Sequence, residues 1–366
     1  MMDHREGILE LDLAEGTAAK RSLKCISSKC LPELRFSDQQ KSLLLTEMGY
    51  PLMLQIERVY YPVLAVIGVP VNLVAIVILS RGKCGLSKCV TRYLVGMAAA
   101  DLLVVITDVI LKRVVEIYFP VSFLTITPVC RLFATMKFAV MAASVWFTVV
   151  FTFDRFVAIC CQKLKTKYCT EKTAAAVIGV VSALSCLLNS PWYFVFVPEY
   201  IMDNVARGCV MKSTLFTSPA WAAFDLFNLA LTPCLPFILI LLFNVLTARH
   251  ILAASRVRRG LRGRSNVENH KDAEMENRRK SIILLFCISG SFILLWSTGV
   301  FYVISPHITN SQSYTASDIE PVGFMLQLLS CCTNTCIYAV TQTKFREELK
   351  NGLKYPLNVI VTLAKS

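Results

Sequence analysis

Long apolar runs recur along the chain, with short polar intervals between them. A helix needs roughly 20 apolar residues to cross a hydrocarbon core of about 30 Å, and a helix satisfies its own backbone hydrogen bonds in lipid. Four runs reach this length without any charge: residues 59–80, 174–197, 281–305 and 321–341. Three more runs contain ionisable side chains: residues 93–111, 132–159 and 220–246. We therefore expect an all-α membrane protein built as a bundle of seven transmembrane helices.

Charge sets the expected orientation of these helices. The net charge is +13, although only 17% of the residues are charged and 55% are hydrophobic. Lys and Arg gather in alternate intervals, around residues 81–92, 163–172 and 256–264, and again after residue 341. Short cytoplasmic loops collect such residues, so we expect a multi-pass plasma-membrane protein with its N-terminus outside. Attraction to anionic lipid accounts for the basic charge, and the pattern does not indicate nucleic acid as a partner.

Three regions are expected along the chain. Residues 1–56 are mixed in charge and lack an apolar segment typical of a cleavable signal peptide, which predicts an extracellular N-terminal tail without stable structure. Residues 57–341 form the predicted transmembrane domain. Residues 342–366 are expected to hold a short amphipathic eighth helix and a cytoplasmic tail.

Cysteines on the predicted outer side favour one disulfide. Cys130 begins the third span at the outer surface, and Cys209 lies in the loop between the fourth and fifth spans. Because the outside of the cell is oxidising, we expect these two residues to be bonded, the alternative being two unpaired thiols. Whether Cys25 and Cys30 form a second bridge stays open.

Polar motifs recur at set places in the predicted spans. Asp154-Arg155-Phe156 stands at the inner end of the third span, and Asp101 lies in the second. Further landmarks follow along the chain: Asn72, Pro236, Phe292, Trp296 and the segment from Asn334 to Tyr338. Together they resemble the rhodopsin-like (class A) G-protein-coupled receptors. The segments RYLVGMAAADLLVV and CCTNTCIYAVTQTKFREELK are similar to the branch of probable G-protein-coupled receptors 139 and 142.

The resemblance implies roles for several of these residues. Asp154, Arg155, Phe292, Trp296, Asn334 and Tyr338 match the family's conformational switch. Asp101, Ser144 and Asn334 match an allosteric sodium site, the alternative being a polar cluster satisfied by water. Phe292 and Trp296 are four residues apart and so share one helix face, where ordinary core packing is the competing interpretation.

The chain also departs from the family pattern. Thr298 and Thr335 stand where prolines are usual, so the sixth and seventh spans are expected to be straighter. Asn244 and Arg278 replace the usual partners of Arg155, which predicts a weak resting lock and ligand-independent activity.

The outer half of the predicted bundle offers eight residues to a ligand. Seven are polar, and Met141 forms a soft apolar wall: Lys137, Asp108, Lys112, Met141, Asp225, Asn228, Tyr302 and Glu320. Lys137 disfavours a simple amine and favours a carboxylate. The alternative is an internal ion pair of Lys137 with Asp108 or Glu320, because charges inside membranes usually pair with one another. A free aromatic amino acid such as Trp or Phe would suit this pocket, and so would a short peptide.

The predicted function is therefore transmission of an extracellular small-ligand signal to a heterotrimeric G protein, which the branch implies to be of the q/11 class. A transporter or ion channel that uses Asp101 and Lys137 is the alternative, but the halves of the chain share no repeat. No arrangement of residues prepares a nucleophile, so an enzyme is not expected.

Overall fold

The computed structural model describes residues 38–119, 121–202, 204–212, 215, 218–261, 272–309 and 316–352. Two compact units are distinguished, Met1–Leu52 and Met53–Ser366, and the first contributes the beginning of helix α2, Asp38–Ser80. Cys25 and Cys30 lie outside the described residues. All further description concerns the second unit.

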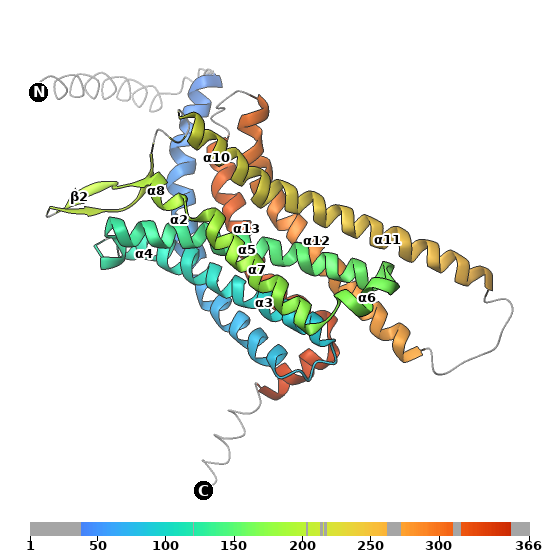
Figure 1. Cartoon of the computed structure of the whole chain (residues 1–366). Helices are drawn as coiled ribbons and strands as arrows, with labels where there is room; N and C mark the ends of the chain where they lie inside the picture. Colours follow the sequence, from blue (N-terminus) through green and yellow to red (C-terminus); the bar gives the residue numbers. More distant parts are fainter. Residues whose placement is uncertain are drawn as a thin grey trace, which may run out of the picture. The chain divides into compact units, whose positions relative to one another are not determined.

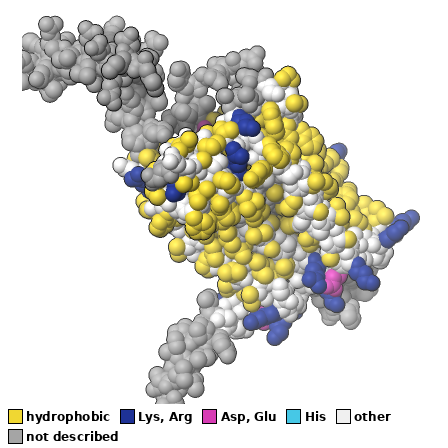
Figure 2. Space-filling model, turned by 60° about the vertical axis from the view of Figure 1, so that its left-hand side comes forward, with side chains coloured by type: hydrophobic (Ala, Val, Ile, Leu, Met, Phe, Trp, Pro, Cys, Tyr) yellow, Lys and Arg dark blue, Asp and Glu magenta, His cyan; other side chains and the backbone are white. Residues whose placement is uncertain are grey.

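Seven helical segments of this unit are long and apolar enough to cross a membrane: Leu52–Ser80, Lys88–Tyr118, Thr127–Cys160, Glu171–Val195, Pro219–Arg256, Arg279–Ile304 and Glu320–Thr341. They confirm the predicted fold class (Figure 1). Figure 2 shows a broad band of hydrophobic side chains on one face, with most of the visible Lys and Arg side chains above and below it. This arrangement is what a lipid-facing surface requires.

The second and fifth spans each contain a π-helical segment. The second consists of α3 (Lys88–Val104), η1 (Val105–Val114) and α4 (Val115–Tyr118). The fifth consists of α10 (Pro219–Leu229), η3 (Ala230–Cys234) and α11 (Leu235–Leu261). Pro233 lies inside η3 and has no N–H to donate, which accounts for the local irregularity there.

The remaining helices complete the bundle. They are η2 (Phe123–Thr125), α5 (Thr127–Cys160), α6 (Gln162–Tyr168), α7 (Glu171–Asn189), α8 (Trp192–Val195), α12 (Asp272–Thr309) and α13 (Ala316–Thr341). Helix α5 is the central element, since it packs against α3, α7, α11 and α12 (Figure 1). Residues 343–352 form a further helix, and its Phe345 is fully buried against Tyr338, with ring centroids 5.8 Å apart.

Between the fourth and fifth spans the chain forms short antiparallel strands. Strands β2 (Tyr200–Met202) and β3 (Val205–Arg207) make a hairpin, and β1 (Phe196–Val197) pairs with β4 (Val210–Met211). The hydrophobic pattern did not predict these strands.

The structure differs from the expected tail of residues 1–56, because helix α2 already begins at Asp38. Leu, Met and Gln are frequent just before residue 56, and all three favour helices. Several spans also extend beyond their uncharged runs. A helix can continue with charged side chains wherever it leaves the apolar layer.

Candidate functional site

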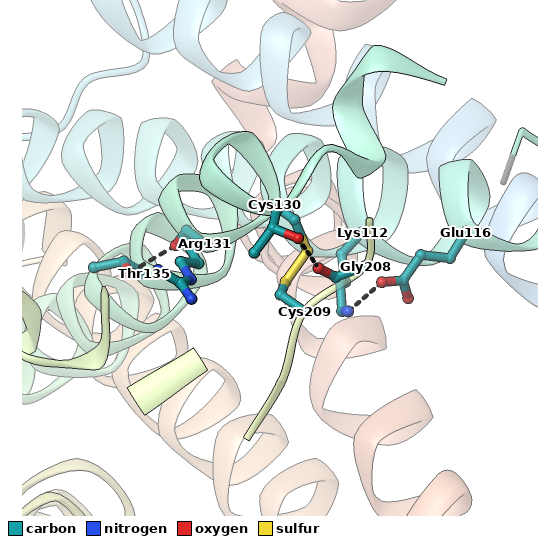
Figure 3. Close-up of a disulfide and its surroundings, with 8 residues drawn as sticks. Lys112, Glu116, Cys130, Arg131, Thr135, Gly208 and Cys209 are labelled. Atoms are coloured by element: carbon teal, nitrogen blue, oxygen red, sulfur yellow. Dashed lines mark hydrogen bonds and ion pairs between the residues drawn. A yellow bond between two sulfur atoms is a disulfide. The ribbon is translucent and has the colours of Figure 1, made fainter. Parts of the chain in front are cut away.

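The disulfide between Cys130 and Cys209 is present, as predicted, with the two Cα atoms 5.9 Å apart. It joins the start of α5 to the segment after the β2–β3 hairpin (Figure 3). Hydrogen bonds reinforce the junction, because Thr127 Oγ1 donates to Gly208 O at 3.0 Å and Gly208 N donates to Thr125 O at 2.7 Å. We call this end of the bundle the disulfide end.

A buried ion cluster lies nearer the middle of the bundle. Asp108 is 2% exposed, and its Oδ1 lies 3.4 Å from Lys137 Nζ and 3.4 Å from Arg113 Nε. Arg113 Nη1 also donates to the Tyr61 hydroxyl at 2.6 Å, and its guanidinium stands 4.7 Å from the centre of the Tyr61 ring. One carboxylate therefore serves two cations that come from different spans.

This cluster contains the ion pair that was the alternative interpretation of Lys137. Lys137 pairs with Asp108 across spans two and three, whereas Glu320 accepts a hydrogen bond from the Tyr302 hydroxyl at 2.6 Å. The Lys137 side chain still keeps 21% of its surface exposed. An internal ion pair and access for a ligand are thus compatible.

The other residues expected at the ligand site are spread over the disulfide-end half. Lys112 forms an ion pair with Glu116 one helical turn away. Asn228 is buried and donates to Phe224 O at 2.9 Å, Asp225 is half-buried, and Met141 packs between two apolar clusters. The structure therefore does not gather the eight predicted residues into one cavity.

Below the ion cluster, Phe292 and Trp296 stack with ring centroids 5.0 Å apart. They pack with Val145, Val149 and Ile240, and Trp296 Nε1 donates to Ser330 Oγ at 3.1 Å. The pair therefore joins α12 to α5, α11 and α13, and a shift of its rings would change the packing of all four helices.

Asp101 lies deeper and is 2% exposed. Ser144 Oγ donates to one carboxylate oxygen at 2.6 Å, and Asn334 Nδ2 donates to the other at 2.8 Å. All three predicted residues therefore come together. A cavity of about 10 Å³ beside them is also lined by Ser330 and Trp296. It has room for one water-sized particle.

At the end opposite the disulfide, Asp154 and Arg155 form a buried ion pair. Arg155 Nη1 also donates to Ser281 Oγ of α12 at 3.3 Å. Two thiols hold Asp154 in place, because Cys89 Sγ donates to its Oδ1 at 3.2 Å and Cys169 Sγ donates to its backbone oxygen at 3.7 Å. Burial raises the pKa of the Cys169 thiol to about 12, so this thiol stays protonated and able to donate.

Two residues, Asn244 and Arg278, replace the family's usual partners of Arg155. Asn244 is buried and accepts a hydrogen bond from Ser289 Oγ at 3.1 Å, so it links α11 to α12 rather than contacting Arg155. The side chain of Arg278 lies outside the described side chains. Among the described side chains of α12, Ser281 contacts Arg155.

Sequence reasoning missed Arg113, Cys89 and Ser281. Arg113 carried a signal, since an arginine near the end of an apolar span is costly unless it pairs. Cys89 and Ser281 carried none, because small polar residues are common in helices and their roles depend on the neighbouring helix.

A family model described as "7 transmembrane receptor (rhodopsin family)" matches residues 71–338. The C5a anaphylatoxin chemotactic receptor 1 of Oncorhynchus mykiss is 25% identical over 310 residues, which cover 82% of this chain and 81% of that receptor. Probable G-protein coupled receptor 142 of Mus musculus is 26% identical over 305 residues, 80% of this chain and 71% of that protein.

The gonadotropin-releasing hormone receptor of Mus musculus is 24% identical over 220 residues, 57% of this chain and 64% of that receptor, so the chain spans less than two thirds of this relative. The family model covers most of the chain, and seven apolar helices, the disulfide and the Asp154–Arg155 pair lie within or beside the matched range. The chain therefore belongs to the rhodopsin family of seven-transmembrane receptors.

Proposed function

We propose that this receptor binds a carboxylate-bearing aromatic ligand, either a free amino acid such as Trp or Phe or a short peptide, and signals to a G protein of the q/11 class. The observation that carries the proposal is the ion cluster, in which Asp108 serves both Lys137 and Arg113. Among the described residues, Asp108 is the only carboxylate in ion-pair distance of Lys137. A ligand carboxylate would pair with Lys137 and leave Asp108 to Arg113.

The names of the relatives support a peptide ligand. Two are named as receptors for a releasing hormone and for the C5a anaphylatoxin, and a third, of Drosophila melanogaster, is an FMRFamide receptor. The similarity to Probable G-protein coupled receptor 142 agrees with the branch expected from the sequence. The q/11 class in this proposal is what that branch implies.

Signal transfer would run through the stacked pair Phe292–Trp296 to Arg155. The stack lies on α12, the helix that also presents Ser281 to Arg155. Movement of α12 away from α5 would break the contact between Arg155 and Ser281 and leave the arginine available to the G protein. In this proposal the end with Asp154 faces the cytosol and the disulfide end faces outward, as the basic loops predict.

Asp101, Ser144 and Asn334 fit a sodium ion chemically, because oxygen ligands surround the small cavity and a buried carboxylate needs a cation or a proton. A bound Na⁺ would supply the positive charge that Asp101 lacks. Titration of agonist affinity with NaCl against N-methyl-D-glucamine chloride, in wild type and in Asp101→Asn, tests this. Equal sodium sensitivity of the two proteins would contradict it.

The function is tested by intracellular calcium in cells that express the chain at the surface. Titration with L-Trp and L-Phe is expected to give a saturable rise, and Arg155→Ala at equal surface expression is expected to abolish it. Tryptamine, which has no carboxylate, serves as the matched non-agonist. A flat response to both amino acids despite surface expression would overturn the ligand class or the q/11 coupling.

The role of Lys137 is tested by Lys137→Met, with Lys112→Met as the matched control. Lys112 pairs with Glu116 outside the ion cluster, so its loss is expected to leave the potency of L-Trp within about threefold. Lys137→Met is expected to abolish the response, because the ligand carboxylate loses a cation in a site of low polarity. Unchanged potency would remove Lys137 from the site.

A further inference from the structure

A cavity of about 380 Å³ lies at the disulfide end. Its walls come from the end of span two, the start of α5 and the strand segment after span four, and Cys130 and Cys209 form part of them. Its described lining contains no residue of spans five to seven, and neither Asp108 nor Lys137 belongs to it. It is therefore separate from the site proposed above.

The cavity is held by covalent and polar links. The disulfide ties one wall to the other, and Arg207 Nη1 donates to the backbone oxygens of Val121 and Ser122, both at 3.1 Å. Figure 3 shows the Lys112–Glu116 pair beside the disulfide and Gly208. A volume of this size falls in the range of small-ligand pockets, roughly 300–1,000 Å³.

The charges of the lining do not cancel. The charged lining residues are Lys112, Glu116 and Glu199, and the first two pair with each other. Glu199 has no ion pair or side-chain hydrogen bond with any described residue. A fourth charge nearby, the Arg207 guanidinium, donates to the loop carbonyls and does not line the cavity. The lining as a whole thus carries one excess negative charge.

Gly208 leaves room for this carboxylate. The glycine has a positive φ of 66°, and a Cβ atom added to it would lie 2.5 Å from Glu199 Oε2. The absence of a side chain at position 208 therefore lets Glu199 reach the cavity beside the disulfide. The rest of the lining is mainly apolar or aromatic, including Leu111, Leu124, Phe133, Tyr200 and Val210.

We propose that this cavity is a second binding site, for an organic ammonium ion with an aromatic or apolar body. The ammonium group would bind Glu199, and the body would lie against Phe133 and Tyr200, whose ring faces also attract cations. The two sites select opposite charges. A carboxylate is favoured beside Lys137, whereas an amine is favoured beside Glu199.

Tryptamine is a suitable probe, and 3-methylindole, which lacks the amine, is its neutral counterpart. Binding of each to the purified full-length chain in lipid nanodiscs is measured by isothermal titration. This measurement requires neither a G protein nor a signalling response, so its failure is distinguishable from failure of the proposed function. Wild type is expected to bind tryptamine more tightly than 3-methylindole.

Glu199→Gln is expected to weaken tryptamine binding roughly twofold to fivefold, because it removes one exposed charge partner. The same change should leave 3-methylindole binding unaltered. Phe133→Ala should weaken the binding of both compounds. Lys137→Met and the distant exposed Glu347→Gln are the controls, and both should bind tryptamine as wild type does.

Three results would overturn the second site. One is absence of tryptamine binding to wild type at millimolar concentration. Another is equal affinity of Glu199→Gln and wild type for tryptamine while both retain the same thermal stability. The third is a change of tryptamine affinity in Lys137→Met as large as that in Glu199→Gln, which would assign tryptamine to the site beside Lys137.

Discussion

Individual charges inside the bundle are held by specific partner side chains, on the same span or on a neighbouring one. Asp108 is the clearest case, since Lys137 and Arg113 both depend on it. A buried charge that loses its partner is left with an uncompensated cost of desolvation. Loss of Asp108 would leave two cations unpaired, so Asp108 matters more for stability than either Lys137 or Arg113.

Asp108→Asn is expected to destabilise the receptor strongly, by about 3–5 kcal/mol, because two buried cations lose their carboxylate. Lys137→Met should cost much less, since Arg113 still pairs with Asp108. Thermal unfolding of the two purified variants in the same detergent gives the comparison. A smaller loss for Asp108→Asn than for Lys137→Met would show that Asp108 is not the shared partner.

Cys89 illustrates a residue whose role depends on one contact. Its thiol donates to Asp154, the carboxylate that pairs with Arg155. Cys89→Ala should therefore loosen the resting state and raise ligand-independent signalling about twofold, whereas Cys89→Ser keeps a donor and should raise it less. Calcium or inositol phosphate measured without ligand, at matched surface expression, separates the two variants. Cys186→Ala, at an exposed position of α7, is the control.

At the scale of elements, the contact between α12 and α13 depends on glycine. A Cβ atom at Gly299 would overlap Gln327 Nε2, and a Cβ atom at Gly323 would lie 2.9 Å from Gly299 Cα. Glycines thus bring the two backbones close, in spans that lack the usual prolines at Thr298 and Thr335. The expected straightness of the two spans stays a prediction.

Gly299→Ala is expected to destabilise the receptor by about 1–3 kcal/mol, because the closely packed helices must separate or Gln327 must move. Gly290→Ala is the matched control, since a Cβ atom there would meet nothing within 4 Å. In a helix that substitution should be neutral or stabilise by about 0.5–1 kcal/mol. The double variant Gly299→Ala with Gln327→Ala should recover part of the loss in thermal unfolding. Equal stability of Gly299→Ala and Gly290→Ala would contradict the close contact.

The two π-helical segments differ in how far they could be predicted. Pro233 marks η3, because proline removes a helical hydrogen bond. Segment η1 contains no proline. Its links to other spans are the ion pair of Asp108 with Lys137 of α5 and the hydrogen bond from Arg113 to Tyr61 of α2. Local sequence therefore predicted the helix but not its π-helical geometry.

At the scale of the whole molecule, a disulfide cross-links the strand segment between the fourth and fifth spans to helix α5. The Cys130–Cys209 disulfide closes a long loop, and removal of such a bond typically costs about 2–5 kcal/mol. It also forms a wall of the 380 Å³ cavity.

Cys130→Ser combined with Cys209→Ser is therefore expected to lower the free energy of unfolding by about 2–5 kcal/mol and to abolish tryptamine binding at the 380 Å³ cavity. Cys287→Ser, at an exposed free cysteine, should change neither. Unfolding and titration of the same preparations check both effects. Full tryptamine affinity in the double variant would show that the cavity does not depend on the disulfide.

The sequence by itself determined the class of fold and the positions of the seven spans, because a bilayer imposes a length and an apolar composition on each crossing helix. It also determined the disulfide, whose two cysteines stand on the same predicted side. The motif residues Asp101, Ser144 and Asn334 were identified by resemblance, and the structure brings them into contact.

Only the tertiary structure decided how the charges pair and where the cavities lie. Lys137 could have paired with Asp108 or with Glu320, and the structure pairs it with Asp108. Lys112 was predicted in the same ligand site as Lys137, but it lines the 380 Å³ cavity at the disulfide end. The physical reason is that helix periodicity sets which residues share a face of one helix. The rotation and depth of neighbouring helices then determine which faces meet, and those depend on packing contacts spread over the whole bundle.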